Sequence, residues 1–541
     1  MMNRNDMIRA LTAKGAKPWD FCIIGGGATG LGVAVDAASR GYSTLLLEEY
    51  DFAKGTSSRA TKLIHGGVRY LQQGNIKLVT EALHERGILR RNAPHLVKNQ
   101  SFIVPNYKWW EGPYYGLGLK VYDWMAGELG LGKSRWLSRE EVLELAPTLD
   151  AEGLRGGVMY HDGQFDDARL AINLAQTAAG QGAVLLNYFR VDGLIKTDGR
   201  VTGVRATDQL NRGSFEVAAA AVINATGVFT DNILRLDDPH AAQVIAPSQG
   251  VHIILDKSYL PGKAAILVPH TDDGRVLFAV PWHDKIIVGT TDTPVSRPTI
   301  EPRALPEEVD FILQQIGRYL QKVPTRKDIR SVFAGLRPLV KSSSKRTAEL
   351  ARDHLILVSD SGLITITGGK WTTYRRMAED TVNKAIQRAG LSARACVTET
   401  LPIHGSGGEA GAQTGGREAG GSGADEPLQI YGSDAEAIRA LAAANPKWGE
   451  RLHQRLPYIQ AEIVWAVREE LCMTVEDALS RRTRSLLLDA MAAIECAPLV
   501  ASLLAAELGR DEAWEQQQIT YFRELAGNYL PDLSTTINSA I

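Results

Sequence analysis

Two kinds of apolar pattern alternate along the first fifty residues. Residues 20–27 (DFCIIGGG) form a short apolar run that ends in glycines, residues 28–40 show the spacing of small and apolar residues typical of a helix, and residues 43–48 (STLLLE) form a second apolar run. Continuous apolar strands are expected where a parallel sheet is covered on both faces. The pattern therefore predicts a βαβ unit at the start of the chain.

Similar patterns return later in the chain. Residues 191–206 predict a hairpin that turns at Asp198-Gly199, and the apolar run 217–224 predicts a further buried strand. Residues 364–380 repeat the opening order of apolar strand, paired glycines and helix. We assign these segments to the same discontinuous domain as the opening unit.

The segment 251–293 has an antiparallel pattern instead. Residues 275–282 and 285–292 are strand candidates on either side of His283-Asp284, which suits a two-residue turn. A predicted helix follows at 307–322. This strand-rich region predicts a second domain inserted into the first.

The chain changes character after residue 404. Residues 405–424 contain nine glycines and no large apolar residue, which predicts a flexible linker. Residues 432–541 show helical periodicity, with a start that resembles a capping box at 474–477 and a stricter one upstream at 138–141. The richest apolar window, 486–508, is interrupted by two acidic residues and a proline, so we expect no membrane-spanning helix.

Composition excludes several classes of protein. The 541 residues are 44% hydrophobic and 23% charged, which is ordinary for a soluble globular protein and excludes wholesale disorder. The formal net charge of −2 gives no reason to expect nucleic acid as a partner. The N-terminus lacks the apolar core of a signal peptide, and none of the four cysteines is in CxxC spacing. We therefore expect a cytoplasmic protein with reduced thiols and no metal site.

The strongest local motif is G-x-G-x-x-G at residues 25–30 (GGGATG), between the first predicted strand and helix. Such glycines allow a tight turn, close approach of backbone to a pyrophosphate, and close packing of helix on strand. Glu48 ends the second strand and is placed to bind ribose hydroxyls, with Glu49 as the alternative acceptor. The motif predicts a dinucleotide site; the competing interpretation is a plain glycine-rich turn.

NAD and FAD share this fingerprint, and the segments around it favour FAD. Residues 55–71 (GTSSRATKLIHGGVRYL) are rich in hydroxyls, glycines and bases, where a nicotinamide enzyme usually continues with regular βα repeats. The strand that ends in NATG at 224–227 also suits an FAD fold. At 364–376 a helix N-terminus is placed to stabilise an anionic reduced flavin ring.

Ordered motifs along the chain resemble the flavin-dependent glycerol-3-phosphate dehydrogenases. The resemblance covers roughly residues 19–403 and 428–530 and is far more specific than the glycine fingerprint alone. The matching segments are TSSRATK (56–62) with LIHGGVRYLQ (63–72), FDDARL (165–170), NATG (224–227), SQGVHIIL (248–255), VPWHDKIIVGTTD (280–292), AGLRPL (334–339) and GGKWTTYR (368–375).

The resemblance implies a mixed α/β fold of three parts. These are a glutathione-reductase-type, Rossmann-like FAD domain, an inserted antiparallel sheet over the flavin, and a C-terminal helical domain. The expected boundaries are 19–105, 150–240 and 330–403 for the FAD-binding domain, 106–149 and 241–329 for the substrate or cap domain, 405–427 for the linker, and 428–541 for the helical domain.

The resemblance also implies an activity and its site. Family members oxidise sn-glycerol 3-phosphate to dihydroxyacetone phosphate and pass the electrons through FAD to a membrane quinone. A phosphorylated substrate needs fixed cations, and Arg69, Tyr70, Arg337 and Lys370 correspond to family substrate positions. The expected cofactor-binding residues are Gly25, Gly27, Ala28, Thr29, Gly30, Glu48, Thr56, Ser57, Ser58, Thr61, Lys62, Leu63, His65, Gly66, Gly67, Ala225, Thr226, Gly227, Gly368, Gly369, Lys370 and Thr372.

Oxidation of the alcohol requires a group that accepts the hydroxyl proton. His65 and His252 are the two candidates, and each has the structural role of a buried histidine as its alternative. Arg337 is a candidate for stabilising the developing alkoxide. Position 249, where relatives often carry Lys, is Gln here, so we expect one cation fewer near the substrate.

Electron delivery to a quinone requires contact with a bilayer. Residues 108–124 (KWWEGPYYGLGLKVYDW) hold six aromatic side chains, which favour the headgroup interface. The segment predicts a monotopic contact at the inner face of the cytoplasmic membrane, with an aromatic-rich packed helix as the alternative. Family members are often dimers, so a homodimer is also an open alternative.

Three other functions compete with this one. An oxidase with the same substrate would pass electrons to O₂, although such relatives usually carry an extra insertion that we do not find before residue 400. A related flavoenzyme would act on an amine or another 2-hydroxy compound. A flavin-binding regulator would show no turnover.

Overall fold

The computed structural model describes residues 2–13, 17–67, 75–341, 354–407 and 427–531. The predicted βαβ unit is confirmed as β1 (Trp19–Ile24), α2 (Ala28–Ser39) and β2 (Thr44–Leu47). β1 and β2 pair in parallel, with Ile23 opposite Leu46, and both of these side chains are fully buried.

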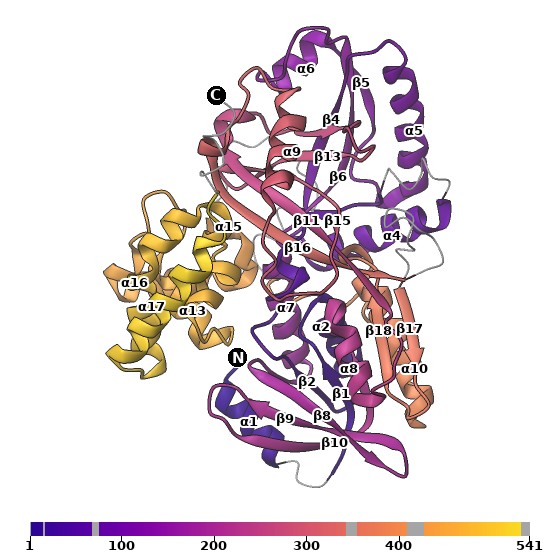
Figure 1. The fold of residues 1–541 in the computed structure, drawn as a ribbon, viewed down its shortest axis with the longest axis vertical. Coiled ribbons are helices and arrows are strands. Elements are labelled where there is room, and N and C mark those ends of the chain that lie inside the picture. The colour runs from indigo at the N-terminus through magenta and orange to yellow at the C-terminus, as the bar shows by residue number, and fades with distance from the viewer. Residues whose placement is uncertain (1, 14–16, 68–74, 342–353, 408–426, 532–541) are drawn as a thin grey trace.

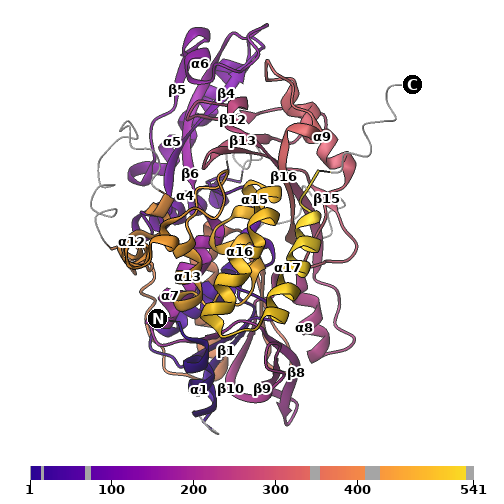
Figure 2. The same ribbon diagram turned by 90° about the vertical axis from the view of Figure 1, so that its left-hand side faces the viewer.

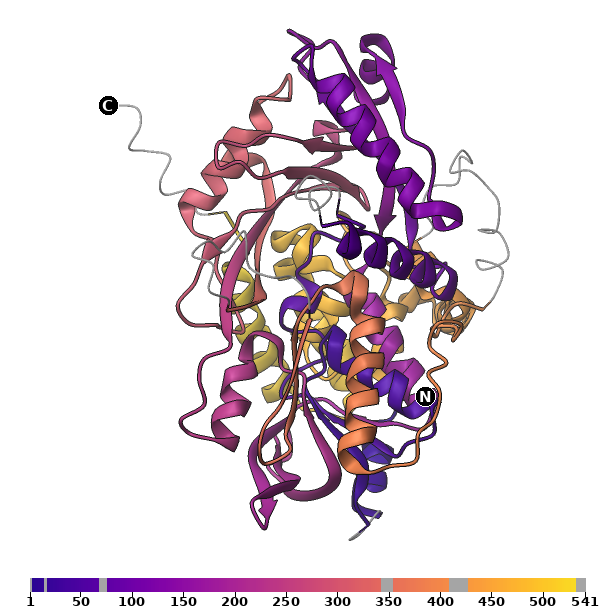
Figure 3. The ribbon, with the colours of Figure 1, turned by 90° about the vertical axis from the view of Figure 1, so that its right-hand side faces the viewer.

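The opening unit belongs to a largely parallel sheet in the order β17-β18-β10-β1-β2-β7, shown in the lower half of Figure 1. β17 pairs antiparallel with β18, and the predicted hairpin forms as β8 and β9, which pair with each other beside β10. Figure 3 shows α10 beside the orange β17–β18 hairpin, and α2 packs on both α7 and α10. The bounds are α7 (Asp167–Gly180), β7 (Val184–Leu186), β8 (Phe189–Thr197), β9 (Arg200–Asp208), β10 (Ser214–Asn224), β17 (His354–Val358), β18 (Ile364–Gly368) and α10 (Tyr374–Ala389).

The predicted antiparallel region forms a second sheet in the order β15-β11-β14-β13-β12-β4-β6-β3, with β16 paired to β11 and β5 to β6. It occupies the upper half of Figure 1. α9 packs on β11, β13 and β14, whereas α5 packs on β4, β5 and β6. The bounds are β3 (Leu63–Ile64), β4 (Lys98–Asn106), α5 (Glu111–Ala126), β5 (Arg135–Ser138), β6 (Gly156–Gln164), β11 (Ile245–Asp256), β12 (Ala265–Val268), β13 (Leu277–Trp282), β14 (Lys285–Gly289), β15 (Thr293–Pro294), α9 (Pro306–Gly317) and β16 (Ile329–Val340).

The second sheet takes strands from segments that the expected boundaries assign to the FAD-binding part. β3, β4, β6 and β16 all belong to it. The chain crosses between the two sheets several times, and an apolar strand pattern does not show which sheet a strand joins. α9 also ends at Gly317, five residues before the end of the predicted helix at 307–322.

The C-terminal part is helical, as predicted, and lies beside both sheets in Figure 1. Its core is continuous with side chains of the second sheet, among them Ile254 and Phe333. Both predicted capping boxes form, one starting at Thr474 and one at Ser138. The main helical segments are η8 (Pro427–Asp434), α12 (Ala435–Ala444), α13 (Gln460–Glu469), α14 (Val475–Asp477), η10 (Ala478–Arg482), α15 (Ser485–Leu488), α16 (Ala490–Leu508) and α17 (Glu512–Gly527).

Helix α16 is, among the residues that the structure describes, the one helix long and apolar enough to cross a membrane. Ala493, Ala497 and Ala501 are fully buried. Figure 2 shows α16 between α13 and α17, and α16 contacts both. Its small apolar residues therefore form a packed helix–helix interface within the domain.

The remaining helices connect or cover these parts. They are α1 (Arg4–Ala13), α4 (Ile76–Asn92), α6 (Arg139–Leu145) and α8 (Thr230–Asp237). All four cysteines are free thiols, and burial raises the pKa of Cys22 and of Cys496 to about 12.

Candidate cofactor and substrate site

A cavity of about 480 Å³ opens where β1, β2, β10 and β18 end. The carboxyl ends of parallel strands are the usual place for a dinucleotide in such a sheet. The volume lies within the range of about 300–1,000 Å³ that small-molecule sites occupy. The sequence-predicted residues on its wall are Gly25, Gly27, Ala28, Thr29, Glu48, Thr56, Ser57, Ala225, Thr226, Gly227, Gly368, Gly369 and Lys370.

The glycine turn is packed too closely for side chains. Gly25 has a φ of +108°, and a Cβ there would lie 2.8 Å from the carbonyl oxygen of Ala225. A Cβ on Gly30 would lie 1.9 Å from the carbonyl oxygen of Gly25. Gly27 caps α2, and the backbone N–H of Ala28 donates to Ser57 Oγ at 2.9 Å. The first turn of α2 thus faces the cavity, where its dipole favours an anion such as a pyrophosphate.

Glu48 lies at the end of β2 with its carboxylate on the cavity wall. The backbone N–H groups of Gly26 and Tyr50 donate to its two oxygens at 2.6 and 2.9 Å. Burial raises the pKa of Glu48 to about 7, against the effect of these two hydrogen bonds. Glu49 also lines the cavity, but Glu48 has the carboxylate that the backbone orients as a ribose-hydroxyl acceptor.

The other predicted cofactor residues do not line the cavity. Lys62 is the clearest case: its Nζ donates to both oxygens of Asp167, at 2.8 and 2.7 Å, and to the Ser58 carbonyl at 2.7 Å. Burial and Arg484 lower the pKa of Lys62 to about 7 although Asp167 acts in the opposite direction. The residues of this group are Gly30, Ser58, Thr61, Lys62, Leu63, His65, Gly66, Gly67 and Thr372, and their contact with a cofactor stays a prediction.

Several wall residues were missed from the sequence. Tyr50 and Lys54 come two and six positions after Glu48, so their place in the segment after β2 was a signal that we could have used. Phe229 follows the NATG motif in the same way. Thr299 and Ile300 come from a separate part of the chain, and no local pattern marks them.

Arg337 lies on β16 beside β11, opposite Ser248. Its guanidinium donates to Asp292 Oδ1 at 3.1 Å, to Thr290 Oγ1 at 3.0 Å and to the Thr291 carbonyl at 2.9 Å. The neighbouring residue, Pro338, lines the cavity. The predicted substrate arginine is therefore held in a fixed orientation on a strand whose next residue lines the cofactor cavity.

His252 is on the same sheet as Arg337 and pairs with Gly289, next to Thr290. Its Nε2 lies 2.9 Å from Thr61 Oγ1, and its ring stacks on Phe333 with centroids 4.9 Å apart. Burial, with help from Arg337, lowers the pKa of His252 well below its usual value. The ring is therefore neutral at physiological pH, and the same lowered pKa makes it a weaker base than an ordinary histidine.

The remaining predicted substrate and catalytic residues are Lys370, His65, Arg69 and Tyr70. Lys370 is on the cavity wall directly before the helical turn at Trp371–Thr373. His65 is half-buried after β3, and the backbone N–H of the next residue, Gly66, donates to Tyr122 Oη at 2.8 Å. Arg69 and Tyr70 lie outside the described residues.

Gln249 has a structural contact of its own. Its Nε2 donates to Glu308 Oε2 at 2.7 Å and to the Arg303 carbonyl at 2.9 Å, and the side chain is buried. Thr291 and Thr293 donate to the other oxygen of Glu308. In this structure the neutral amide of Gln249 therefore contacts the Glu308 carboxylate.

Family models and relatives match nearly the whole chain. Residues 20–375 match the family of FAD-dependent oxidoreductases, and residues 396–515 match the C-terminal domain of alpha-glycerophosphate oxidase. The mitochondrial glycerol-3-phosphate dehydrogenase of Homo sapiens is 42% identical over 95% of this chain and 74% of its own length. The mitochondrial enzyme SDP6 of Arabidopsis thaliana is 39% identical over 98% of this chain and 89% of its own.

Two solved structures differ in how closely they match. The glycerol-3-phosphate dehydrogenase from Bacillus halodurans, solved with FAD, has a TM-score of 0.78 and 30% identity, with 98% of both chains covered. The L-alpha-glycerophosphate oxidase from Mycoplasma pneumoniae has a TM-score of 0.53 and 17% identity, covers 70% of this chain and 97% of its own, and shows the fold alone.

The fold and the cavity define an FAD-dependent oxidoreductase with a C-terminal helical domain. Within that class, the chain belongs to the FAD-dependent glycerol-3-phosphate dehydrogenase family. The predicted family, fold class, cofactor and enzyme class are confirmed, and the dehydrogenase interpretation fits better than the oxidase one.

Proposed function

We propose that this protein oxidises sn-glycerol 3-phosphate to dihydroxyacetone phosphate and delivers the electrons to a quinone at a membrane. The observation that carries the proposal is the oriented Arg337, with the neutral His252 near it, next to the cavity at the strand ends. Among the residues that the structure describes, no group of His, Cys, Asp and Glu is arranged to hold a metal ion.

The residues present fit FAD as the cofactor. Side chains at Gly25, Gly27 and Gly30 would collide with or crowd neighbouring atoms, so the backbone beside the first turn of α2 stays open to a ligand. The Glu48 carboxylate is oriented to accept hydrogen bonds from ribose hydroxyls. When bound, FAD supplies the hydride acceptor. The wall around Gly368, Gly369 and Lys370 is where we expect the flavin end, because a helical turn begins there.

The substrate residues act by charge and by proton transfer. A phosphate of about −2 charge needs fixed cations, which Arg337 and Lys370 provide. Arg69 is expected to add a further cation and Tyr70 a hydroxyl that donates a hydrogen bond. His252 accepts the hydroxyl proton in its neutral form, while Thr61 fixes the ring at Nε2. His65 stays the alternative proton acceptor.

The function is tested by the spectrum of the flavin. Anaerobic addition of sn-glycerol 3-phosphate is expected to bleach the visible flavin band, and a quinone analogue is expected to restore it quickly. O₂ alone is expected to restore the flavin band only slowly. Fast recovery with O₂ would favour the oxidase, and no bleaching would favour a flavin-binding regulator.

The aromatic segment divides into a buried and an exposed face on α5. Tyr115 and Tyr122 are buried, and Tyr122 Oη donates to Asp162 Oδ2 at 2.8 Å. The opposite face is exposed and apolar at a spacing of three and four residues, with Trp124 82% exposed. This exposed stripe consists of Trp110, Tyr114, Leu117, Val121 and Trp124.

We propose that the exposed stripe contacts the inner face of the cytoplasmic membrane. Trp109, 77% exposed, extends it, and Lys120 lies 4.3 Å from the ring centroid of Trp136 nearby. Aromatic rings flanked by lysines suit the headgroup region of an anionic bilayer. A homodimer stays a prediction.

Replacing both Trp110 and Trp124 by Ser is expected to weaken binding to anionic lipid vesicles by about tenfold or more, because the stripe loses its two largest apolar side chains. Vesicle sedimentation measures the change. The matched control is Tyr521→Ser, which removes an exposed aromatic from α17 and should leave binding unchanged. Equal loss in both variants would contradict a localised membrane contact.

A further inference from the structure

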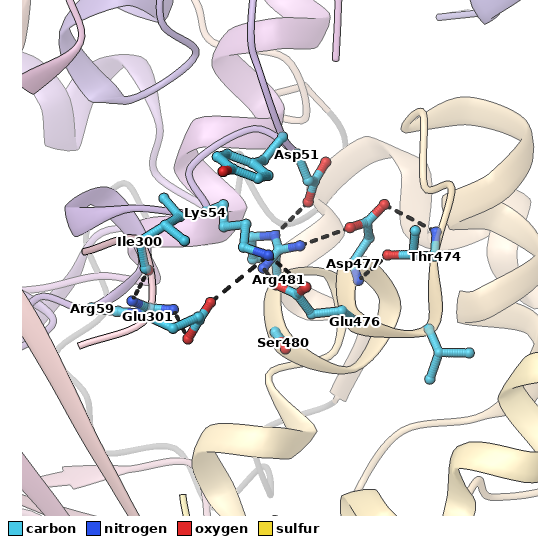
Figure 4. A network of polar contacts seen from close by, with 12 residues as sticks. Asp51, Lys54, Arg59, Ile300, Glu301, Thr474, Glu476, Asp477, Ser480 and Arg481 are labelled. Carbon is cyan, nitrogen blue, oxygen red and sulfur yellow. Dashed lines mark hydrogen bonds and ion pairs between the residues drawn. The ribbon is translucent and has the colours of Figure 1, made fainter. Parts of the chain in front are cut away.

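A set of buried charges joins the C-terminal helical part to the cofactor part of the molecule (Figure 4). The helical part contributes Glu476, Asp477 and Arg481, and the segment after β2 contributes Asp51 and Lys54. The side chains of all five are at most 6% exposed. Such groups are stable inside a protein only when each charge has its partners.

One of these contacts reaches the cavity wall itself. The wall includes most of residues 48–57, and Lys54 is part of it. Lys54 Nζ donates to Glu476 Oε2 at 2.7 Å, and the other oxygen of Glu476 accepts from Arg481 at 2.9 Å. Glu476 therefore connects a helix of the C-terminal part to the segment that lines the cofactor cavity.

Asp51 fixes the same segment at a second point. Arg482 donates to its two oxygens at 2.7 and 3.0 Å, and Arg481 also donates to it. Burial alone would raise the pKa of Asp51, but Arg482 and Arg481 together lower it to about 2. Asp51 is thus ionised at physiological pH, and its buried negative charge is balanced by Arg481 and Arg482 of the helical part.

A second wall segment, 298–300, is held in a similar way. Arg59 donates to the Ile300 carbonyl at 2.7 Å and to Glu301 Oε2 at 2.6 Å. Tyr529, after α17, donates its hydroxyl to the same Glu301 oxygen at 3.1 Å. The two wall segments are far apart in the chain, yet both are therefore held by contacts with the C-terminal part.

We propose that the C-terminal helical domain sets the affinity for FAD, because Glu476 is a positioning residue that holds Lys54, and with it the segment 48–57, in the conformation that binds the cofactor. The inference rests on FAD as the cofactor and is independent of the substrate and of the electron acceptor.

The test is Glu476→Gln, which keeps the shape and removes the charge. The Kd for FAD, from titration of the deflavinated protein well below its unfolding temperature, is expected to rise by tenfold or more, which is about 1.4 kcal/mol. The increase in Tm that FAD produces is expected to shrink. Hydrogen exchange of the amides at 51–58 should become faster in the FAD-free protein.

The matched control is Glu462→Gln. Glu462 is also fully buried in the helical part, but its carboxylate accepts from the Tyr431 hydroxyl and the Ile459 backbone N–H, and it is not part of the cofactor cavity wall. This variant should lower the Tm of the FAD-free protein while the Kd for FAD stays within about twofold of the original. An unchanged Kd in Glu476→Gln, or an equal rise in both variants, would overturn the proposal.

Should Glu476→Gln fail to fold, Tyr529→Phe tests the second wall segment with a smaller change. It removes only the hydroxyl that contacts Glu301 and Arg59. The Kd for FAD is expected to rise about threefold, since one hydrogen bond to a charged group is lost. A Kd equal to that of the original protein would also overturn the proposal.

Discussion

Replacing Arg337 by Ala is expected to lower kcat/KM for sn-glycerol 3-phosphate by about a thousandfold or more. The substitution removes the cation that we assign to the substrate, and it leaves the Asp292 carboxylate, only 9% exposed, without its 3.1 Å partner. The Asp292 carboxylate keeps the Ser248 hydroxyl and the more distant Arg275, 3.9 Å away, but loses its nearest cation, so its charge adds repulsion of the anionic substrate to the lost attraction. A thousandfold loss of kcat/KM corresponds to about 4 kcal/mol of transition-state stabilisation.

The measurement separates binding from chemistry. Anaerobic stopped-flow reduction of the flavin gives the rate of the reductive half-reaction and its dependence on substrate concentration. Arg337→Lys should recover part of the affinity for substrate but not the several hydrogen bonds of the guanidinium, because an ammonium group has no planar fork of donors.

The matched control is Arg330→Ala, on the same strand. Arg330 is 43% exposed and pairs with Asp256 at the surface, so its removal should change kcat/KM by less than about twofold. A kcat/KM of Arg337→Ala within threefold of the original would contradict the assignment of Arg337 to the substrate and would favour a flavoenzyme for another compound.

The sequence allowed the fold to be predicted wherever the pattern is local. The opening βαβ unit, the hairpin β8–β9 and the capping box at Thr474 each depend on residues close together in the chain, and each is confirmed. The assignment of β4, β6 and β16 to a sheet depends on pairing with distant strands, such as the long antiparallel register of β16 with β11. No local pattern encodes that choice.

The same distinction applies to the site. Thirteen of the predicted cofactor positions line the cavity, because glycine turns and strand ends must lie there for chemical reasons. Lys62 is in a donor-rich segment too, but its partner Asp167 is more than a hundred positions away and turns it into a structural ion pair. Ile300 joins the wall through tertiary contacts, among them the hydrogen bond from Arg59 to its carbonyl.

Replacing Gly30 by Ala is expected to abolish retention of FAD. The new Cβ would lie 1.9 Å from the carbonyl oxygen of Gly25, far inside van der Waals contact, and that atom is backbone and cannot move as a side chain can. α2 and the turn after β1 must separate, which moves the helix N-terminus away from where we place the pyrophosphate. Overpacking of this kind costs about 1–3 kcal/mol in stability alone, and the lost geometry adds to that.

The purified variant should lack the visible flavin band, and the FAD-free protein should unfold at a lower temperature. Gly180→Ala is the matched control, because Gly180 ends α7 on the surface and a Cβ there meets no atom within 4 Å. It should retain FAD and unfold at the same temperature as the original or slightly above it, since Ala is the better helix former by about 1 kcal/mol. A Gly30→Ala protein that keeps one FAD per chain would show that the turn at 25–30 does not hold the pyrophosphate, and would leave Glu48 and the segment 48–57 as the main determinants of cofactor binding.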